Sequence, residues 1–125
     1  MINEGSFGQV FEGFDVITDE PVAIKTEKID AFKPLLLYEA KVLRLLESST
    51  LGIPKILYAG QEGQYNLIVT ELLGPSLFDL QKYVGRQFTM QTTVMLAIET
   101  IKLLKHVHDK GFLHRDLKPA NICVG

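Results

Sequence analysis

Several features that would mark a specialised class of protein are scarce in this sequence. Cys123 is the only cysteine, so no intrachain disulfide can form, and we expect an intracellular setting in the cytoplasm or nucleus. The formal net charge is only −2, which gives no sign of a nucleic-acid surface. Apolar runs are a few residues long, so neither a membrane span nor a secretory signal is expected. The remainder, 46% hydrophobic and 22% charged over 125 residues, is typical of a globular protein with one modest core.

The chain divides at Gly74-Pro75 into a strand-rich part and a helical part. Before this break, alternating β-branched and aromatic residues predict two hairpins, and turn residues separate their strands. The first hairpin pairs residues 10–16 with 22–26, and the second pairs residues 55–59 with 65–71. We therefore predict an α+β fold.

One helix is predicted between the hairpins, over residues 34–48. Leu35, Val42 and Leu46 form an apolar stripe at helical spacing, and Glu39 lies in the same stripe. A carboxylate on a buried face is costly unless it has a partner, although a glutamate at the edge of the stripe could simply reach water. Lys25 on the preceding strand is the partner that we expect.

After the break, two further helices are predicted. Ser76 and Asp79 resemble a capping box for a short helix that ends near Gly85. Thr89 is a suitable N-cap for a helix over residues 90–110. This second helix is apolar on more than one face, so we expect several neighbours to cover it.

A glycine-rich segment precedes the first hairpin. Gly5 and Gly8 let the backbone turn tightly and bring its N–H groups close to phosphate oxygens. An ordinary hairpin turn explains the same residues about as well, so this segment alone is weak support for a phosphate site.

Lys25 ends the segment V-A-I-K at residues 22–25. Strand alternation places Ala23 and Lys25 on one face, where a small residue and a cation can lie beneath a flat ligand. A lysine in this position can hold phosphates if the helical Glu39 fixes its direction. The alternative is a surface lysine on an edge strand, and the stripe position of Glu39 favours the functional interpretation.

The most specific motif is H-R-D-L-K-P-A-N at residues 114–121. Its spacing suits phosphoryl transfer: Asp116 accepts or orients the proton of a hydroxyl, Lys118 neutralises the transferring phosphate, and Asn121 ligates a metal ion. His114 is more plausible as a structural imidazole than as the base, because Asp116 fits that role.

Together these motifs resemble the N-terminal part of a eukaryotic protein kinase, and more narrowly the casein kinase I family. The narrower resemblance rests on Tyr38-Glu39, the G-I-P at residues 52–54, the Y-x-G-Q-E at 58–62 and the E-L-L-G-P-S-L at 71–77. It covers essentially the whole chain. It implies a small antiparallel β lobe with one helix over residues 1–73 and the first helices of an α-rich lower lobe over residues 74–125.

The resemblance also implies the ligands and the residues that meet them. ATP and magnesium are the expected cofactors, with Asn121 as the metal ligand. Protein serine and threonine hydroxyls in an acidic or pre-phosphorylated context are the expected acceptors. The family pattern places nucleotide-binding roles at Asn3, Gly5, Gly8, Val10, Ala23, Lys25, Glu39, Thr70, Glu71 and Leu73. Thr70, immediately before the expected hinge, would control access to a pocket behind the adenine.

The departures from the family pattern matter as well. Asn3 stands at the first glycine of the glycine-rich motif, and Ala120 stands where an acidic residue is common. No D-F-G or activation segment follows residue 121, so we expect these 125 residues alone to be nearly inactive. Two alternatives stay open: a non-catalytic nucleotide-binding or interaction module, and an incomplete gene product.

Overall fold

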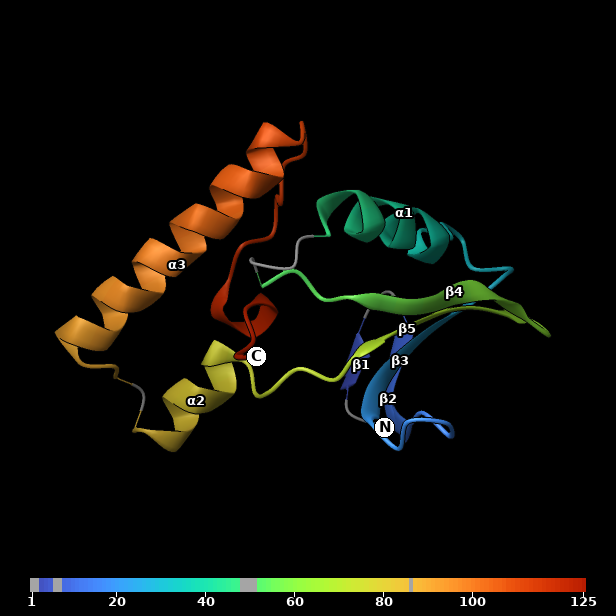
Figure 1. The fold of residues 1–125 in the computed structure, drawn as a ribbon, viewed down its shortest axis with the longest axis horizontal. Coiled ribbons are helices and arrows are strands. Elements are labelled where there is room, and N and C mark those ends of the chain that lie inside the picture. Colours follow the sequence, from blue (N-terminus) through green and yellow to red (C-terminus); the bar gives the residue numbers. More distant parts are fainter. Residues whose placement is uncertain (1–2, 6–7, 48–51, 86) are drawn as a thin grey trace. The chain divides into compact units, whose positions relative to one another are not determined.

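The order of secondary structure follows the predicted hairpins and helix caps. The computed structural model describes residues 3–5, 8–47, 52–85 and 87–125. The elements run β1 (Asn3–Gly5), β2 (Gly8–Phe14), β3 (Pro21–Lys28), α1 (Leu36–Leu46), β4 (Ile56–Glu62), β5 (Tyr65–Glu71), α2 (Leu77–Tyr83), α3 (Met90–Asp109) and the 3-10 turn η1 (Pro119–Asn121) (Figure 1).

The chain separates into two units. One consists of Met1–Glu47 and Ile53–Leu72, and the other of Ser48–Gly52 and Leu73–Gly125. The first unit carries the sheet and α1, and the second carries α2, α3 and η1. An antiparallel sheet accompanied by helices confirms the expected α+β, protein-kinase-like fold class. The division into lobes at residue 73 stays a prediction.

The sheet of the first unit has the strand order β1-β2-β3-β5-β4, with every neighbouring pair antiparallel. Asp15 shapes the β2–β3 turn, because its carboxylate accepts bonds from the N–H groups of Ile17 and Thr18. Gly63 has a φ of 58° in the β4–β5 turn, a conformation that glycine adopts without strain. Both hairpins therefore form from local turn chemistry, as the sequence predicts.

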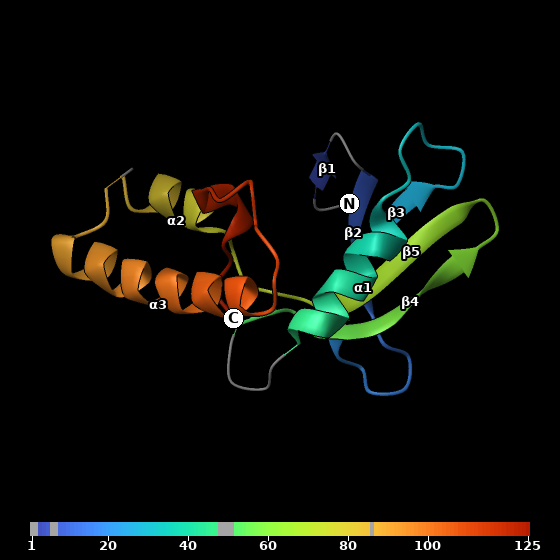
Figure 2. The same cartoon turned by 90° about the horizontal axis from the view of Figure 1, so that it is seen from above.

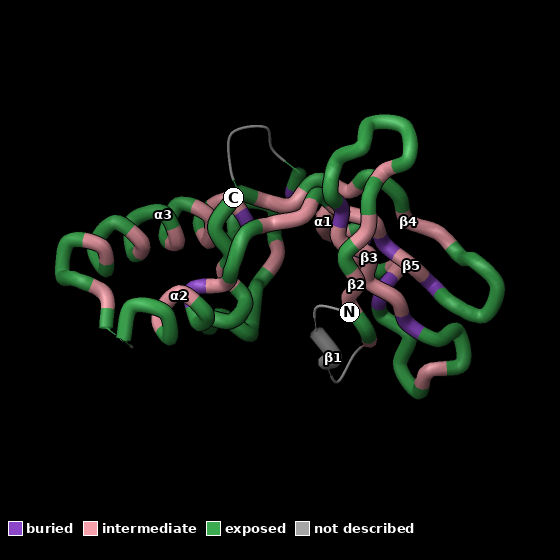
Figure 3. The backbone as a smooth tube through the Cα atoms, turned by 90° about the horizontal axis from the view of Figure 1, so that it is seen from below, coloured by how far each residue is buried: buried purple, intermediate pink, exposed green. Residues whose placement is uncertain are grey.

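Helix α1 covers one face of this sheet (Figure 2). Leu36 and Ala40 are buried against Ile68 of β5, with Ile56 and Ala59 of β4 packed around them. Figure 3 shows the buried residues concentrated in the sheet and α1, with most of the second unit exposed or intermediate.

The predicted buried stripe of α1 was wrong at its start. Leu35 is 49% exposed, and Leu36, one residue later, is the buried one. The helix is also shorter than residues 34–48, and Ser48 lies outside the described residues. The side of α1 that packs on the sheet is centred on Leu36 and Ala40 instead of Leu35. Glu39 lies at the edge of this buried side, and its carboxylate contacts Lys25 of β3.

Pairing registers decide which residues share the α1 face of the sheet. Directly opposed residues in an antiparallel ladder point to the same side. Lys25 opposes Val10 on one neighbour and Ile68 on the other, and Ala23 opposes Thr70. Because Ile68 packs against α1, all five side chains belong to the α1 face.

The helices of the second unit begin at the predicted caps. Ser76 accepts a bond from the Asp79 N–H at the start of α2, and Thr89 accepts one from the Thr92 N–H at the start of α3. Gly111, with φ of 83°, follows the end of α3. The caps, rather than the apolar pattern, define these ends.

Close backbone contacts join the start of α2 to the C-terminal residues. The Gly74 N–H donates to the Val124 carbonyl at 2.7 Å, and the Leu77 N–H donates to the Ile122 carbonyl at 2.8 Å. A Cβ on Gly74 would lie 2.9 Å from that Val124 oxygen, so a glycine is needed for this approach. Figure 2 shows η1 beside α2 within this unit.

Helix α3 is much less covered than its apolar surface predicts. Val107 is its buried residue, whereas Met90, Met95 and Ile101 are 80%, 59% and 65% exposed. In the described part of the chain, no helix is both long and apolar enough to cross a membrane.

Candidate functional site

Lys25 and Glu39 form an ion pair between β3 and α1. The Lys25 ammonium donates to both carboxylate oxygens of Glu39, at 2.8 and 2.7 Å. The contact that we expect from the strand face and the helix stripe is therefore present. Both side chains are partly exposed, at 32% and 43%, and such pairs add little stability. The geometric consequence is larger, because the bidentate contact fixes the direction of the lysine.

The described part of the glycine-rich segment is a short pairing of β1 with β2. Asn3 opposes Val10, and Gly5 opposes Gly8, whereas residues 6 and 7 between them lie outside the described residues. Gly8 has a φ of 142°, and a Cβ there would lie 2.2 Å from the Thr26 carbonyl oxygen. Only glycine fits this position, so Gly8 lets β2 approach β3 at the point where the segment turns.

The residues expected around an adenine fall into two groups. Val10, Ala23 and Thr70 share the α1 face of the sheet with Lys25, as the registers show. The Thr70 hydroxyl donates to the carbonyl of Glu71 at 3.1 Å. Glu71 ends β5 in the first unit, whereas Leu73 belongs to the second unit.

Glu71 has a structural contact that the sequence did not suggest. Its carboxylate accepts a bond from the Lys55 N–H at 2.9 Å, and its own N–H donates to the Lys55 carbonyl at 3.3 Å. The side chain thus secures the residue before β4.

The loop at residues 114–121 brings its three candidate residues together. The Lys118 ammonium lies 2.9 Å from the Asp116 carboxylate. The Asn121 amide nitrogen donates to the same carboxylate at 3.0 Å and to the Asp116 carbonyl at 2.9 Å. This small network, all on exposed side chains, holds a carboxylate, a cation and an amide within one turn of chain.

The network also sets the protonation of Asp116. The hydrogen bond from Lys118 is the main cause that lowers the pKa of Asp116 below the ordinary value of 3.8, and the bond from Asn121 lowers it further. Asp116 is therefore ionised at neutral pH and can accept or orient a hydroxyl proton. Arg115, with φ of 67°, has an unusual backbone conformation for a residue other than glycine, and such outliers gather at functional loops.

The loop supplies oxygen donors of the kind that magnesium prefers. Because the Asn121 nitrogen is bonded to Asp116, its amide oxygen is the atom left for a cation. Across the described ranges, no group of three His, Cys, Asp or Glu side chains could hold a metal ion. Magnesium commonly uses one or two protein oxygens together with phosphates and water, so the donors at this loop fit that mode.

Glu27, two residues after Lys25 on β3, is a residue that the sequence did not single out. It is only 6% exposed, and its carboxylate accepts bonds from the N–H groups of Leu35 and Leu36 at the start of α1. A signal was available, because alternation along β3 places Ala23, Lys25 and Glu27 on one face. A carboxylate on that face next to a predicted helix start indicates a cap from outside the helix.

The comparison with known families agrees with this geometry. A family model described as "protein kinase domain" matches residues 1–125, which is the whole of the chain. In protein kinases a strand lysine paired with a helix glutamate and a catalytic loop with Asp and Asn take part in phosphoryl transfer. The pair of Lys25 with Glu39 and the network at residues 114–121 have these residue types. The chain belongs to the protein kinase domain family.

Proposed function

We propose that this chain supplies the nucleotide-holding sheet and the catalytic loop of an ATP-dependent serine/threonine protein kinase of casein kinase I type. The observation that carries the proposal is the bidentate pair of Lys25 with Glu39. Such a pair points a lysine at the α- and β-phosphates of a bound nucleotide. The casein kinase I assignment is supported by the motifs at residues 52–54, 58–62 and 71–77.

The chemistry follows from the residues of each unit. Lys25 binds phosphate oxygens, and Glu39 keeps it directed toward them. Asp116, ionised and held by Asn121, orients the acceptor hydroxyl and takes its proton as the phosphoryl group is transferred. Lys118 offsets the charge of that group, and Asn121 is the candidate ligand of magnesium. Magnesium held by Asn121 would supply positive charge that neutralises the phosphates.

The acceptor class is proposed to be serine or threonine hydroxyls in acidic or pre-phosphorylated protein segments. This part of the proposal is supported by the resemblance to the casein kinase I family. We also propose a location in the cytoplasm or nucleus, where a chain with a single cysteine needs no disulfide.

The first test is nucleotide binding by the 125-residue chain. Isothermal titration with Mg-ATP is expected to show binding that Lys25→Met weakens about tenfold or more, because the lost bond is charge-assisted. Lys110→Met, an exposed lysine at the end of α3, is the matched control and should bind as the parent does. Failure of the parent to bind Mg-ATP, or equal losses in both variants, would overturn the proposal.

The second test addresses the acceptor class. A product of the gene that continues through a D-F-G segment should phosphorylate an acidic serine peptide in preference to its tyrosine and its neutral counterparts. Asp116→Asn should abolish that activity. Preference for tyrosine would exclude the serine/threonine assignment, and indifference to acidic context would exclude the casein kinase I type.

A further inference from the structure

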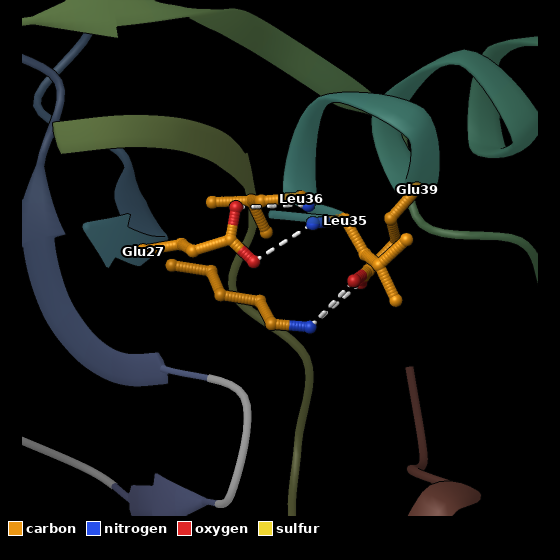
Figure 4. A network of polar contacts seen from close by, with 5 residues as sticks. Glu27, Leu35, Leu36 and Glu39 are labelled. Carbon is orange, nitrogen blue, oxygen red and sulfur yellow. Dashed lines mark hydrogen bonds and ion pairs between the residues drawn. The ribbon is translucent and has the colours of Figure 1, made fainter. Parts of the chain in front are cut away.

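The carboxylate of Glu27 is buried inside the first unit and has no part in the proposed phosphate chemistry. It accepts hydrogen bonds from the Leu35 N–H at 2.9 Å and the Leu36 N–H at 3.2 Å (Figure 4). Burying a carboxylate is costly unless its oxygens are bonded, so a residue that merely filled space here would be apolar. The two oxygens each accept from a different N–H, which defines the orientation of the carboxylate against the helix.

Those two N–H groups belong to the first turn of α1. The first N–H groups of a helix have no partner within the helix, and an acidic group near them is favoured by the helix dipole. Leu35 is the N-cap residue and makes no side-chain cap bond. Glu27 therefore provides, from a neighbouring strand, the cap that the helix sequence lacks.

The same first turn carries Glu39. The Glu39 N–H donates to the Leu35 carbonyl at 2.9 Å, so these residues are joined across a single helical turn. Whatever fixes the Leu35 backbone against β3 also fixes the Cα of Glu39 relative to β3. Glu39 then reaches back to Lys25, which lies two residues before Glu27 on the same strand face.

The two links run in opposite directions. Glu27 extends from β3 to the backbone of α1, and Glu39 extends from α1 to the side chain of Lys25 (Figure 4). Apolar contact of Leu36 and Ala40 with Ile68 holds the N-terminal half of the helix on the sheet, but apolar packing is not directional. A hollow of about 220 Å³ remains at this end of the helix, bordered by Lys25, Glu27, Leu35, Leu36 and Glu39. Leu36 thus anchors one side of the first turn, and the hollow leaves room on the side where Leu35 and Glu39 lie. The polar links act on that side.

We propose that Glu27 is a positioning residue that clamps the first turn of α1 to β3 and thereby keeps Glu39 on Lys25. The proposal rests on the proposed function for its consequence, since the lysine so held is the one that meets phosphate. Asn66 of β5 supports the clamp: its amide donates to Glu27 at 3.4 Å and accepts from Gln61 at 3.3 Å. Asn66 is itself buried, so this support lies inside the unit.

Two readouts on the full 125-residue chain test the clamp without nucleotide. The first is amide hydrogen exchange at Leu35 and Leu36 compared with Ile68 in the core. The second is trace acylation of the Lys25 amine relative to the exposed Lys110, measured by mass spectrometry. Glu27→Gln replaces one acceptor oxygen with an NH₂ group, so we expect about fivefold faster exchange at the two helix amides, as for loss of a typical cap. The acylation ratio of Lys25 should rise by a similar factor.

Two further variants separate positioning from other effects. Asn66→Ala keeps the charge of Glu27 but removes its support, so a smaller rise in Lys25 acylation is expected there. This variant also decides the question if Glu27→Gln does not fold. Glu20→Gln removes an exposed carboxylate from the turn between β2 and β3, and should change neither readout.

The outcomes are distinct. Selective rises at Leu35, Leu36 and Lys25 in both clamp variants support the proposal. Faster exchange at the helix amides with unchanged Lys25 acylation would reduce Glu27 to a simple cap and overturn it. A uniform rise that includes Ile68 would show general loss of stability and also overturn it. If Mg-ATP does not bind to the parent chain, the proposed function fails while these readouts still report on the clamp.

Discussion

Lys25 and Glu39 are 14 residues apart in the chain, and the lysine ammonium lies within 2.8 Å of both glutamate oxygens. The pair joins β3 to α1, so it can form only when α1 lies in this position on the sheet. Its partial exposure means that its loss should alter ligand binding more than folding.

Glu39→Gln is expected to weaken Mg-ATP binding while leaving the unfolding free energy within about 1 kcal/mol of the parent. The amide can still contact Lys25 but no longer supplies the charge that directs it. Calorimetric titration and urea unfolding on the same samples measure the two effects. Glu47→Gln, an exposed glutamate just after α1, is the matched control. A loss of stability as large as the loss of binding would mean that the pair serves the fold instead.

Gly8→Ala should destabilise the first unit by about 1–3 kcal/mol, because a Cβ would overlap the Thr26 carbonyl oxygen and φ is 142°. Gly63→Ala is the comparison, since its φ is also positive at 58° but open space surrounds its Cβ. Urea unfolding of both variants separates the clash from the backbone strain. Equal destabilisation of the two would show that the clash at Gly8 is relieved by a small shift of β3.

The titration of Asp116 should occur below the ordinary aspartate pKa of 3.8, because the bond from Lys118 favours the ionised form. A depressed pKa in the folded chain contributes stability above the unfolded value, and that contribution is lost as the pH falls through the folded pKa. Carboxyl NMR chemical shifts measured against pH give the midpoint. Lys118→Met should raise it, and Lys102→Met, in a separate exposed ion pair with Glu99, should not. An unchanged midpoint in Lys118→Met would contradict the loop network.

Local patterns predicted much of this fold. The turn at Gly63 and the caps at Ser76 and Thr89 were readable because each acts on residues within a few positions of itself. The pairing of Lys25 with Glu39 was also predictable, since a strand face and a helix stripe each restrict one partner and the family resemblance supplied the pairing. These agreements come from turn and cap residues that act locally, from periodicity along one strand and one helix, and from the family resemblance.

The remaining features depend on contacts between distant residues. The buried face of α1 begins at Leu36 instead of Leu35, and that choice is made by the position of Ile68 on β5. The bond of Glu71 to the Lys55 N–H spans 16 residues and follows from the β4–β5 register. The cap from Glu27 spans eight residues and two elements. The propensity of a short segment does not predict contacts between residues so far apart, although alternation along β3 offered a partial signal for Glu27.

Thr70→Met is expected to weaken an enlarged ATP-competitive ligand much more than Mg-ATP itself. Thr70 lies opposite Ala23 on the α1 face of the sheet, so a longer side chain there would project from the same face as Lys25. Threonine could also be present only for its strand propensity, and the experiment separates the two explanations. Competition binding of both ligands to parent and variant is the measurement. Thr26→Met, on the other face of β3, is the matched control. Equal losses for both ligands would contradict a gating role.

The chain should associate through α3 when it is isolated. The exposed apolar residues of this helix include Met90, Val94, Met95, Ile98 and Ile101. A contiguous apolar surface in water favours association, whereas scattered exposed residues do not. Sedimentation velocity over a range of concentrations should show self-association, and a hydrophobic dye should bind with enhanced fluorescence. Replacing Met95 and Ile101 together with lysine should reduce both signals, while the same change at Val16 and Ile17, exposed in the β2–β3 turn, should have little effect. If the chain sediments as a monomer at every concentration and binds no dye, the exposed apolar residues of α3 do not cause association, and the prediction is wrong.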